Sequence, residues 1–277
     1  MDWKGREQSQ NVEDRRGSSG GGGKAPGILG IIVVLVGAYY GVDLSGLVGT
    51  PSMGPGSTQT SQLKPQEEAE LNELARVVLA DTEKAWGSYF KQIGRTYNPT
   101  TMVLYNGGTS TACGMGQSAM GPFYCPGDQK VYLDLDFYRD MQTKLNSASD
   151  AAFAYVIAHE VGHHVQNLLD ILPKVHRMQQ QVGKKEANAL SVKLELQADC
   201  YAGIWGHYAV NNNIFKAEDI TKAMLAAESV GDDRLQKEGQ GYVVPDSFTH
   251  GSSEQRMAWL KRGLDSGDIN QCNTFGN

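Results

Sequence analysis

The stretch AYVIAHEVGHHVQ, residues 154–166, places three histidines and a glutamate among mostly apolar positions. His159 and His163 are four residues apart, so in a helix their rings project from one face and can share one tetrahedral ion. Glu160 lies between them and completes the pattern H-E-x-x-H, in which the glutamate sits beside the water that the metal activates. The stretch therefore predicts a zinc site on a helix.

The motif could also arise by chance or lie on the solvent-exposed face of a helix. A bare H-E-x-x-H arises in such a chain by random placement on the order of one time in a hundred. The histidines could also lie on a solvated helix face, but the flanking alanines, valines and isoleucine make the helix apolar nearly all round. Imidazoles and a carboxylate in such surroundings must be paired or bound to metal. Gly162, at mid-helix, indicates that another backbone or a ligand comes close there.

A second acidic pair lies in LELQADCYAG, residues 194–203. Glu195 and Asp199 share one helix face, where like charges repel by a few tenths of a kcal/mol unless a cation lies between them. An ordinary surface charge pair is the alternative. We assign Glu195 as the third ligand of one Zn²⁺ per chain, and Asp199 as the acceptor of the free ring N–H of His159.

The motifs HEVGHH and ELQADCYAG resemble the gluzincin pattern, H-E-x-x-H followed by E-x-x-x-D. The whole sequence is similar to the neutral zinc metallopeptidases of bacterial inner membranes, and the similarity includes NVEDRR and YYGVDL near the N-terminus and VVPDSFTHG and QCNTF near the C-terminus. This resemblance implies zinc and a thermolysin-like, zincin-type pair of active-site helices.

The segment FTHGSSEQR, residues 248–256, carries a second resemblance. Related membrane zinc proteases have T-H-P followed by an arginine six residues after the histidine, and both side chains donate to the oxyanion. His250 and Arg256 match this spacing, whereas Gly251 replaces the proline. The resemblance implies catalytic roles for both residues, since acyl transfer needs such donors. The alternative is a salt bridge with a nearby acid, Asp246 or Glu254.

The function that these residues imply is peptide-bond hydrolysis in extended or unfolded protein segments. Glu160 would take the proton of water and pass it to the leaving amine, and a strand edge in VYLDLDF or GPFYC would hold the peptide by main-chain hydrogen bonds. The alternatives are a catalytically silent zinc-binding scaffold or binder of envelope proteins, and a zinc amidase that acts on cell-wall peptides.

The N-terminal third contains an apolar stretch without charge, Pro26–Val42. A cleaved signal peptide and a buried core helix are alternatives. A leader of 24 residues that includes four acidic residues favours an uncleaved transmembrane anchor over 25–48, because the leader of a signal peptide is normally short and basic. Five Lys and Arg residues precede the stretch and none follows until Lys64, which predicts a cytoplasmic N-terminal tail over 1–24 and a domain outside the cytoplasm, anchored in the inner membrane. The Pro, Gly and Ser-rich residues 49–65 read as a flexible linker, and 66–277 as the metallopeptidase domain.

All four cysteines follow the apolar stretch, which suits an oxidising compartment such as the periplasm. Three pairings are possible, and we favour Cys113 with Cys125 and Cys200 with Cys272; buried free thiols are the alternative. A net charge of −6 argues against nucleic acid as a partner.

The remaining pattern predicts an α+β fold, with a small sheet packed on several helices. We expect a loop over 107–121 and a strand over 101–106, a hairpin around Pro126–Asp128, and helices over 66–93, 150–169, 186–208, 217–230 and 252–263. His164, His176 and His207 are interpreted as satisfied or surface histidines, whereas the roles of Asp232 and Asp233 stay open.

Overall fold

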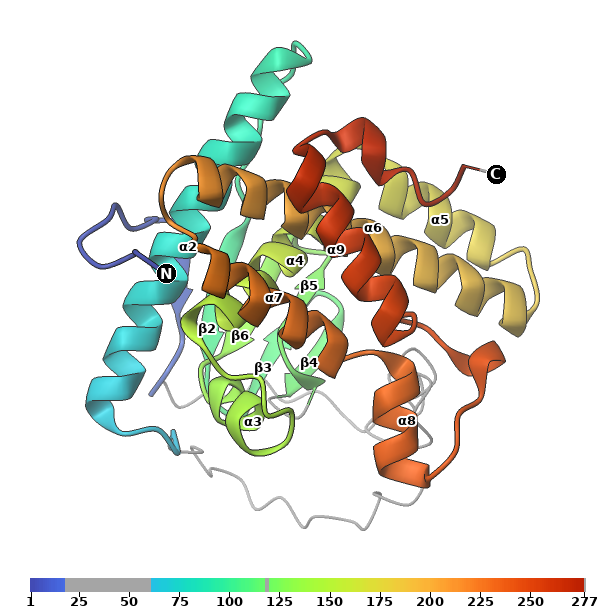
Figure 1. Ribbon diagram of the computed structural model, residues 1–277, viewed down its shortest axis with the longest axis horizontal. Coiled ribbons are helices and arrows are strands. Elements are labelled where there is room, and N and C mark those ends of the chain that lie inside the picture. The colour runs from blue at the N-terminus through green and yellow to red at the C-terminus, as the bar shows by residue number, and fades with distance from the viewer. Residues whose placement is uncertain (18–60, 118–119, 277) are drawn as a thin grey trace.

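The computed structural model describes residues 1–17, 61–117 and 120–276. This part of the chain combines eight α-helices with a four-stranded sheet and a two-stranded ribbon, so the α+β class is confirmed, while the likeness to zincin folds stays a prediction (Figure 1). The helices are α2 Pro65–Gln92, α3 Phe137–Thr143, α4 Asp150–Leu168, α5 Ile171–Gln179, α6 Lys184–Asn211, α7 Ala217–Ser229, α8 Asp232–Gln240 and α9 Ser253–Ser266, with short 3-10 turns η3 Pro245–Ser247 and η4 Ile269–Cys272.

The sheet has the order β1-β2-β6-β5, formed by β1 Val12–Asp14, β2 Thr101–Tyr105, β5 Phe123–Cys125 and β6 Lys130–Asp134. β1 and β2 are parallel, as are β2 and β6, and the predicted hairpin makes β5 antiparallel to β6. β6 therefore has a neighbour on each side. Of the two candidate peptide-binding edges, VYLDLDF lies inside the sheet, and only the β5 segment lies at an edge.

Helix α4 runs through the middle of the molecule, as the apolar flanks of its motif predict. The Ser149 hydroxyl caps it by accepting a hydrogen bond from the Ala152 amide. The helix packs against α2, α6 and α7 and against the sheet. At Gly162 a Cβ atom would come within 3.1 Å of the Ala198 carbonyl oxygen of α6, so the close backbone approach predicted there is confirmed. This contact brings the two motif-bearing helices together.

Several short elements differ from the sequence expectation. The glycine-rich segment after β2 forms a two-stranded ribbon, β3 Gly108–Thr111 with β4 Gly114–Gln117, instead of a loop. Its threonines favour extended backbone, and the Cys113–Cys125 disulfide ties it to β5. Helices α5 and α8 were not predicted, because each is only nine residues long. The predicted last helix is α9, which has Ser252 as its N-cap, contains the expected capping box and continues to Ser266.

Both favoured disulfides, Cys113–Cys125 and Cys200–Cys272, are confirmed. The second ties η4 to α6 one residue after Asp199. Helix α9 also packs closely on α6, since a Cβ atom at Gly263 would come within 1.9 Å of the Cys200 carbonyl oxygen. The C-terminal part of the chain is thus fixed against the helix that carries the second motif.

The N-terminal region differs most from the expected organisation. Residues 1–17, predicted as a tail apart from the domain, contribute β1 to the sheet and lie beside α2 (Figure 1). The predicted anchor, 25–48, and most of the predicted linker, 49–65, lie outside the described residues. No helix within 1–17, 61–117 and 120–276 has the length and apolar character that a bilayer span needs.

Candidate metal centre

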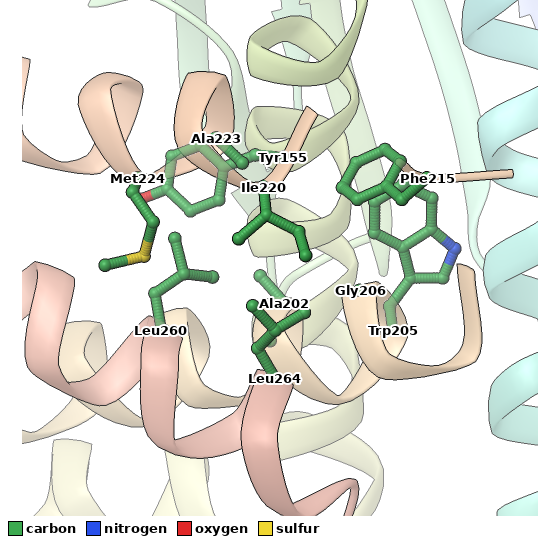
Figure 2. A pocket seen from close by; sticks show the side chains of 11 residues that line it. Tyr155, Ala202, Trp205, Gly206, Phe215, Ile220, Ala223, Met224, Leu260 and Leu264 are labelled. Carbon is green, nitrogen blue, oxygen red and sulfur yellow. The ribbon is translucent and has the colours of Figure 1, made fainter. Parts of the chain in front are cut away.

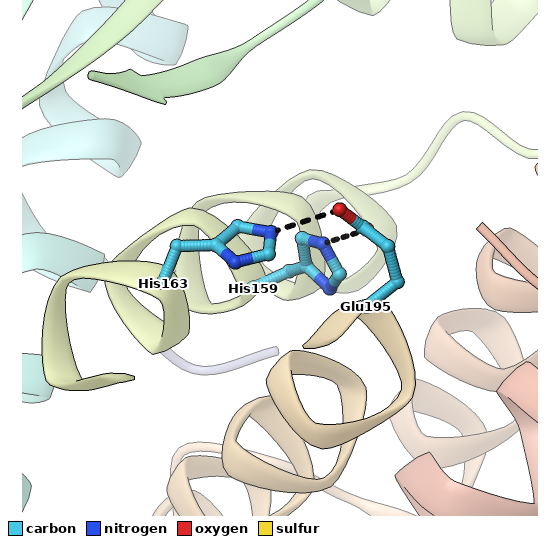
Figure 3. A group of neighbouring side chains, drawn as sticks. All are labelled: His159, His163 and Glu195. Carbon is cyan, nitrogen blue, oxygen red and sulfur yellow. Dashed lines mark hydrogen bonds and ion pairs between the residues drawn. The ribbon is translucent and has the colours of Figure 1, made fainter. Parts of the chain in front are cut away.

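Helix α4 and helix α6 bring the three predicted ligands to one point (Figure 3). The Nε2 atom of His159 lies 3.1 Å from one carboxylate oxygen of Glu195, and Nε2 of His163 lies 3.4 Å from the other. One potential ligand atom of each residue lies within 4.8 Å of those of the other two. The sequence reasoning therefore identified a group of side chains that the fold does assemble.

The other ring nitrogens are already engaged, and their partners define the tautomers. Nδ1 of His159 lies 2.9 Å from Oδ1 of Asp199, which can only accept a hydrogen bond when ionised. The predicted contact between these two residues is thus present. Nδ1 of His163 lies 2.9 Å from Oε1 of Gln166. Both rings therefore carry their proton on Nδ1 when neutral, which leaves both Nε2 lone pairs facing Glu195.

Gln166 was not identified from the sequence, and its own contacts fix its orientation. Its amide nitrogen donates to the Leu194 carbonyl, at 2.8 Å, and to the side-chain oxygen of Gln197, at 3.0 Å. Gln197 in turn donates to the Cys272 carbonyl. Because the amide nitrogen of Gln166 has two acceptors, its oxygen must face His163. The only sequence signal was the i+3 spacing, which puts both side chains on one helix face.

Three lone-pair donors that face one another need a positive charge between them. Protons can supply it: although burial lowers the pKa of His159, Asp199 and Glu195 raise it to about 10. Burial also lowers the pKa of His163, but the neighbouring Glu195 carboxylate raises it, and the net effect is an increase. For Glu195, burial raises the pKa, but the two histidines lower it well below its ordinary value. A zinc ion supplies the same charge, and ligands about 2.0–2.1 Å from tetrahedral zinc are about 3.3 Å apart. The two separations between an Nε2 atom and a Glu195 oxygen, 3.1 and 3.4 Å, are close to that value.

Arg256 occupies a different place from the one predicted. Instead of pointing at a reacting carbonyl, its guanidinium donates from Nε to Oδ2 of Asp199, at 2.8 Å, and from Nη2 to Oδ1, at 3.0 Å. The same Oδ1 accepts the Tyr155 hydroxyl at 2.6 Å. Arg256 is only 4 % exposed and Asp199 is fully buried. The arginine therefore neutralises the carboxylate that orients His159, because an unpaired buried charge is costly.

His250 lies beside the three grouped side chains, whereas its predicted contact with an oxyanion stays a prediction. It lines a small hollow together with His163, Glu195 and Thr249. Its Nδ1 lies 3.2 Å from Oδ1 of Asp232, whose other oxygen accepts the backbone amides of residues 249, 250 and 251. Asp232, left open by the sequence, thus holds the segment that presents His250.

Glu160 is 8 % exposed and lies one residue after His159 on α4. No other side chain of the described residues forms a hydrogen bond with its carboxylate. Burial raises its pKa above the usual range for glutamate, and the neighbouring histidines lower it. A buried carboxylate with a raised pKa beside a ligand set has the properties of a general base.

The other histidines have structural surroundings. His164 lies between the Tyr124 hydroxyl and the Asn98 carbonyl oxygen, and Nδ1 of His207 contacts the Leu264 carbonyl. His176 is half-buried on α5. The interpretation of His164 and His207 as satisfied histidines fits these contacts.

A second hollow lies between α4, α6, α7 and α9 (Figure 2). Its lining is apolar except for Tyr155, whose hydroxyl is bonded to Asp199. The indole nitrogen of Trp205, the other polar atom among the lining side chains, points away from the hollow (Figure 2). This hollow is therefore a packing gap behind the metal centre.

The chain is similar to one described protein family and to proteins of Escherichia coli and Mycobacterium tuberculosis. A family model described as "Putative neutral zinc metallopeptidase" matches residues 1–275. The chain is 53 % identical over 287 residues to the Uncharacterized protein YpfJ of Escherichia coli (strain K12), covering all of this chain and 99 % of that protein. It is 39 % identical over 222 residues to the Uncharacterized protein Rv2575 of Mycobacterium tuberculosis (strain ATCC 25618 / H37Rv), covering 75 % of this chain and 73 % of that protein. No solved structure matches.

Proposed function

Because the chain belongs to the neutral zinc metallopeptidase family, we propose that it is a zinc-dependent endopeptidase that cleaves extended or unfolded protein segments. The observation that carries this proposal is the meeting of three lone-pair donors, His159, His163 and Glu195, beside the buried carboxylate of Glu160. That set leaves one tetrahedral position open, as catalytic zinc sites require and structural ones do not.

His159, His163 and Glu195 would hold the ion. Zinc supplies a Lewis acid that polarises a carbonyl and lowers the pKa of water to about 7. Asp199 and Gln166 fix the two imidazole rings so that each presents Nε2. Such hydrogen-bonded partners orient ligating histidines and raise their basicity.

Glu160 takes the proton from the attacking water and transfers it to the nitrogen of the leaving amine. Its burial supports this role, because a carboxylate with a raised pKa is a stronger base toward water and a competent acid afterwards. His250 donates to the oxyanion from the rim, and Asp232 keeps that ring in place. Arg256 acts on the opposite side, through Asp199, as a positioning residue.

The peptide is held at the edge strand β5, the one member of the sheet that is antiparallel and lies next to α4. Tyr124 of β5 is linked to α4 through His164 and Asn167, which keeps the strand beside the metal centre. An extended segment can add to such an edge by main-chain hydrogen bonds. This binding mode favours unfolded or flexible substrates. The two disulfides support a domain that works outside the cytoplasm.

The test is cleavage of an unfolded protein by the zinc-loaded full chain and by Glu160→Gln. We expect the substitution to lower the rate by about 10²–10⁴-fold with zinc content unchanged. Glu186→Gln, an exposed glutamate in the first turn of α6, is the matched control and should cleave at the normal rate. A wild-type chain with full zinc that cleaves no unfolded protein or peptide library would instead support the silent zinc-binding scaffold.

A further inference from the structure

The first 17 residues are bound to the domain by main-chain pairing. In β1, Val12 lies opposite Met102 and Asp14 opposite Leu104 of β2, in parallel register. The Met102 amide donates to the Asn11 carbonyl, and the Arg15 amide donates to the Leu104 carbonyl. Neighbouring strands lie about 4.8 Å apart. Residues 11–15 therefore belong to the same sheet as the peptide-binding edge proposed above.

Burial of Trp3 adds an apolar contact. Its side chain belongs to the main hydrophobic core and is only 4 % exposed. Its indole nitrogen donates to the carboxylate of Asp150, at 2.7 Å. Asp150 is the first residue of α4, the helix that carries the metal ligands. Burial of such a large apolar side chain in the core stabilises the attachment of residues 1–17 to the domain.

Charged groups complete the attachment. Nε of Arg6 lies 3.5 Å from a carboxylate oxygen of Asp81, which is 1 % exposed on α2. Arg16 pairs with Glu68 at 2.9 Å, and Lys130 pairs with Glu13 at 2.8 Å. Arg15 donates to the Thr109 hydroxyl and the Ser110 carbonyl. A buried acid such as Asp81 needs a cation nearby, and the N-terminal segment supplies it.

These contacts give a structural role to the Lys and Arg residues from which the orientation of the chain in the membrane was predicted. Five Lys and Arg residues precede the apolar stretch, and their number indicated a cytoplasmic N-terminus. Three of them, Arg6, Arg15 and Arg16, bind groups of the domain. A fourth, Lys4, lies over the Trp3 ring. Their positions follow from the fold, so they carry no independent information on topology.

We propose that residues 1–17 and the metallopeptidase domain occupy the same side of the membrane, because β1 is paired with β2 of the domain. A single crossing would separate β1 from β2 by the hydrocarbon core, about 30 Å thick, and would break every contact above. Two crossings would require about 40 apolar residues, whereas the uncharged stretch has seventeen. The proposal concerns the location of residues 1–17 and stands whether or not the domain is a peptidase.

Labelling of single cysteines tests this placement in the full-length protein. The four native cysteines form two disulfides, and the unsubstituted protein is labelled in parallel to give the background. Gln8→Cys reports on the N-terminal segment and Gln181→Cys on the turn between α5 and α6; both positions are exposed. A membrane-impermeant maleimide is added to intact spheroplasts of the expressing bacterium and, in parallel, to lysed ones.

We expect the two variants to behave alike, either both labelled in intact spheroplasts or both labelled only after lysis. Labelling of one variant in intact spheroplasts and of the other only after lysis would overturn the proposal. To verify that β1 is in place during the experiment, Glu13→Lys and Lys130→Glu are compared with the double variant. The double variant should recover stability that each single variant loses; additive losses would also count against the proposal, because they would mean that the pair is not in contact.

Discussion

Replacement of Gln166 by leucine tests how the protein sets the tautomer of a metal ligand. The substitution keeps the approximate size of the side chain but removes the oxygen that accepts from Nδ1 of His163, at 2.9 Å. It also leaves the Leu194 carbonyl and the Gln197 oxygen without their donor, inside a region where Gln166 itself is fully buried. The His163 ring is then free to rotate and to carry its proton on Nε2, where it cannot bind metal.

The expected loss of zinc affinity follows from this one lost contact. Removal of a hydrogen-bonded partner of a ligating histidine typically costs about 10–100-fold in metal affinity, or about 1.4–2.8 kcal/mol. Each buried polar group left unpaired also costs about 1–3 kcal/mol of folding free energy. Affinity must therefore be measured on protein that circular dichroism shows to be folded, by competition with a chromophoric chelator.

A matched control lies on the next residue of the same helix. Asn167 donates to the Tyr124 hydroxyl and touches no ligand, so Asn167→Leu should bind zinc as the wild type does. Cobalt(II) substitution gives a second measurement, since a change in the ligand field at His163 alters the visible spectrum. Equal zinc affinity and equal cobalt spectra in Gln166→Leu and the wild type would refute the tautomer argument without touching the ligand assignment.

Three further changes have distinct expected outcomes. Arg256→Met leaves Asp199 buried without its cation and should cost about 3–5 kcal/mol in urea unfolding; a loss below about 1 kcal/mol would contradict the pairing. Replacement of both Cys200 and Cys272 removes a disulfide that joins residues 72 positions apart, and it should lower the free energy of unfolding by about 4 kcal/mol in the same assay. An unchanged unfolding midpoint would count against this stabilisation. The pKa of Glu13 is lowered from 4.5 to about 2 by Arg15 and Lys130, so its contribution is present above pH 4.5 and is lost as the pH falls through about 2. The side chain is 41 % exposed, so Glu13→Gln should lose at most about 1 kcal/mol at pH 7 and clearly less at pH 2, where the carboxyl group is about half protonated. A difference as large at pH 2 as at pH 7 would be inconsistent with this pKa.

The grouping of His159, His163 and Glu195 could be predicted from the sequence because each motif is local. The i+4 spacing of His159 and His163 fixes their common face whatever the surroundings, and the repulsion between Glu195 and Asp199 indicated a cation at the second helix. Gly162, a glycine in the middle of a helix, indicated that another backbone lies close there, and this backbone is that of α6. These are properties of single helices, and tertiary structure had only to bring two of them together.

The role of Arg256 could not be predicted in the same way. Its spacing from His250 indicated a shared site, but α9 packs so closely on α6 at Gly263 that Arg256 lies against Asp199, behind the ligands. That approach joins segments about 60 residues apart, and local patterns contain no information on it. Asp232 was hidden for the same reason, since the amides it accepts belong to residues 249–251.

The N-terminal strand was missed because β1 is only three residues long and two of these residues are acidic. A short edge strand gives no alternating pattern over enough positions to be recognised. Composition and the charge count then favoured a solvated tail, and only the partner strand β2 reveals the pairing.

The metal content of the purified full-length protein tests the central claim most directly. After removal of free metal, we expect one zinc ion per chain in the wild type, and almost none in His163→Ala or Glu195→Gln, with all three proteins folded. A wild type without bound zinc, or variants that keep a full equivalent, would contradict the assignment of His159, His163 and Glu195 as ligands.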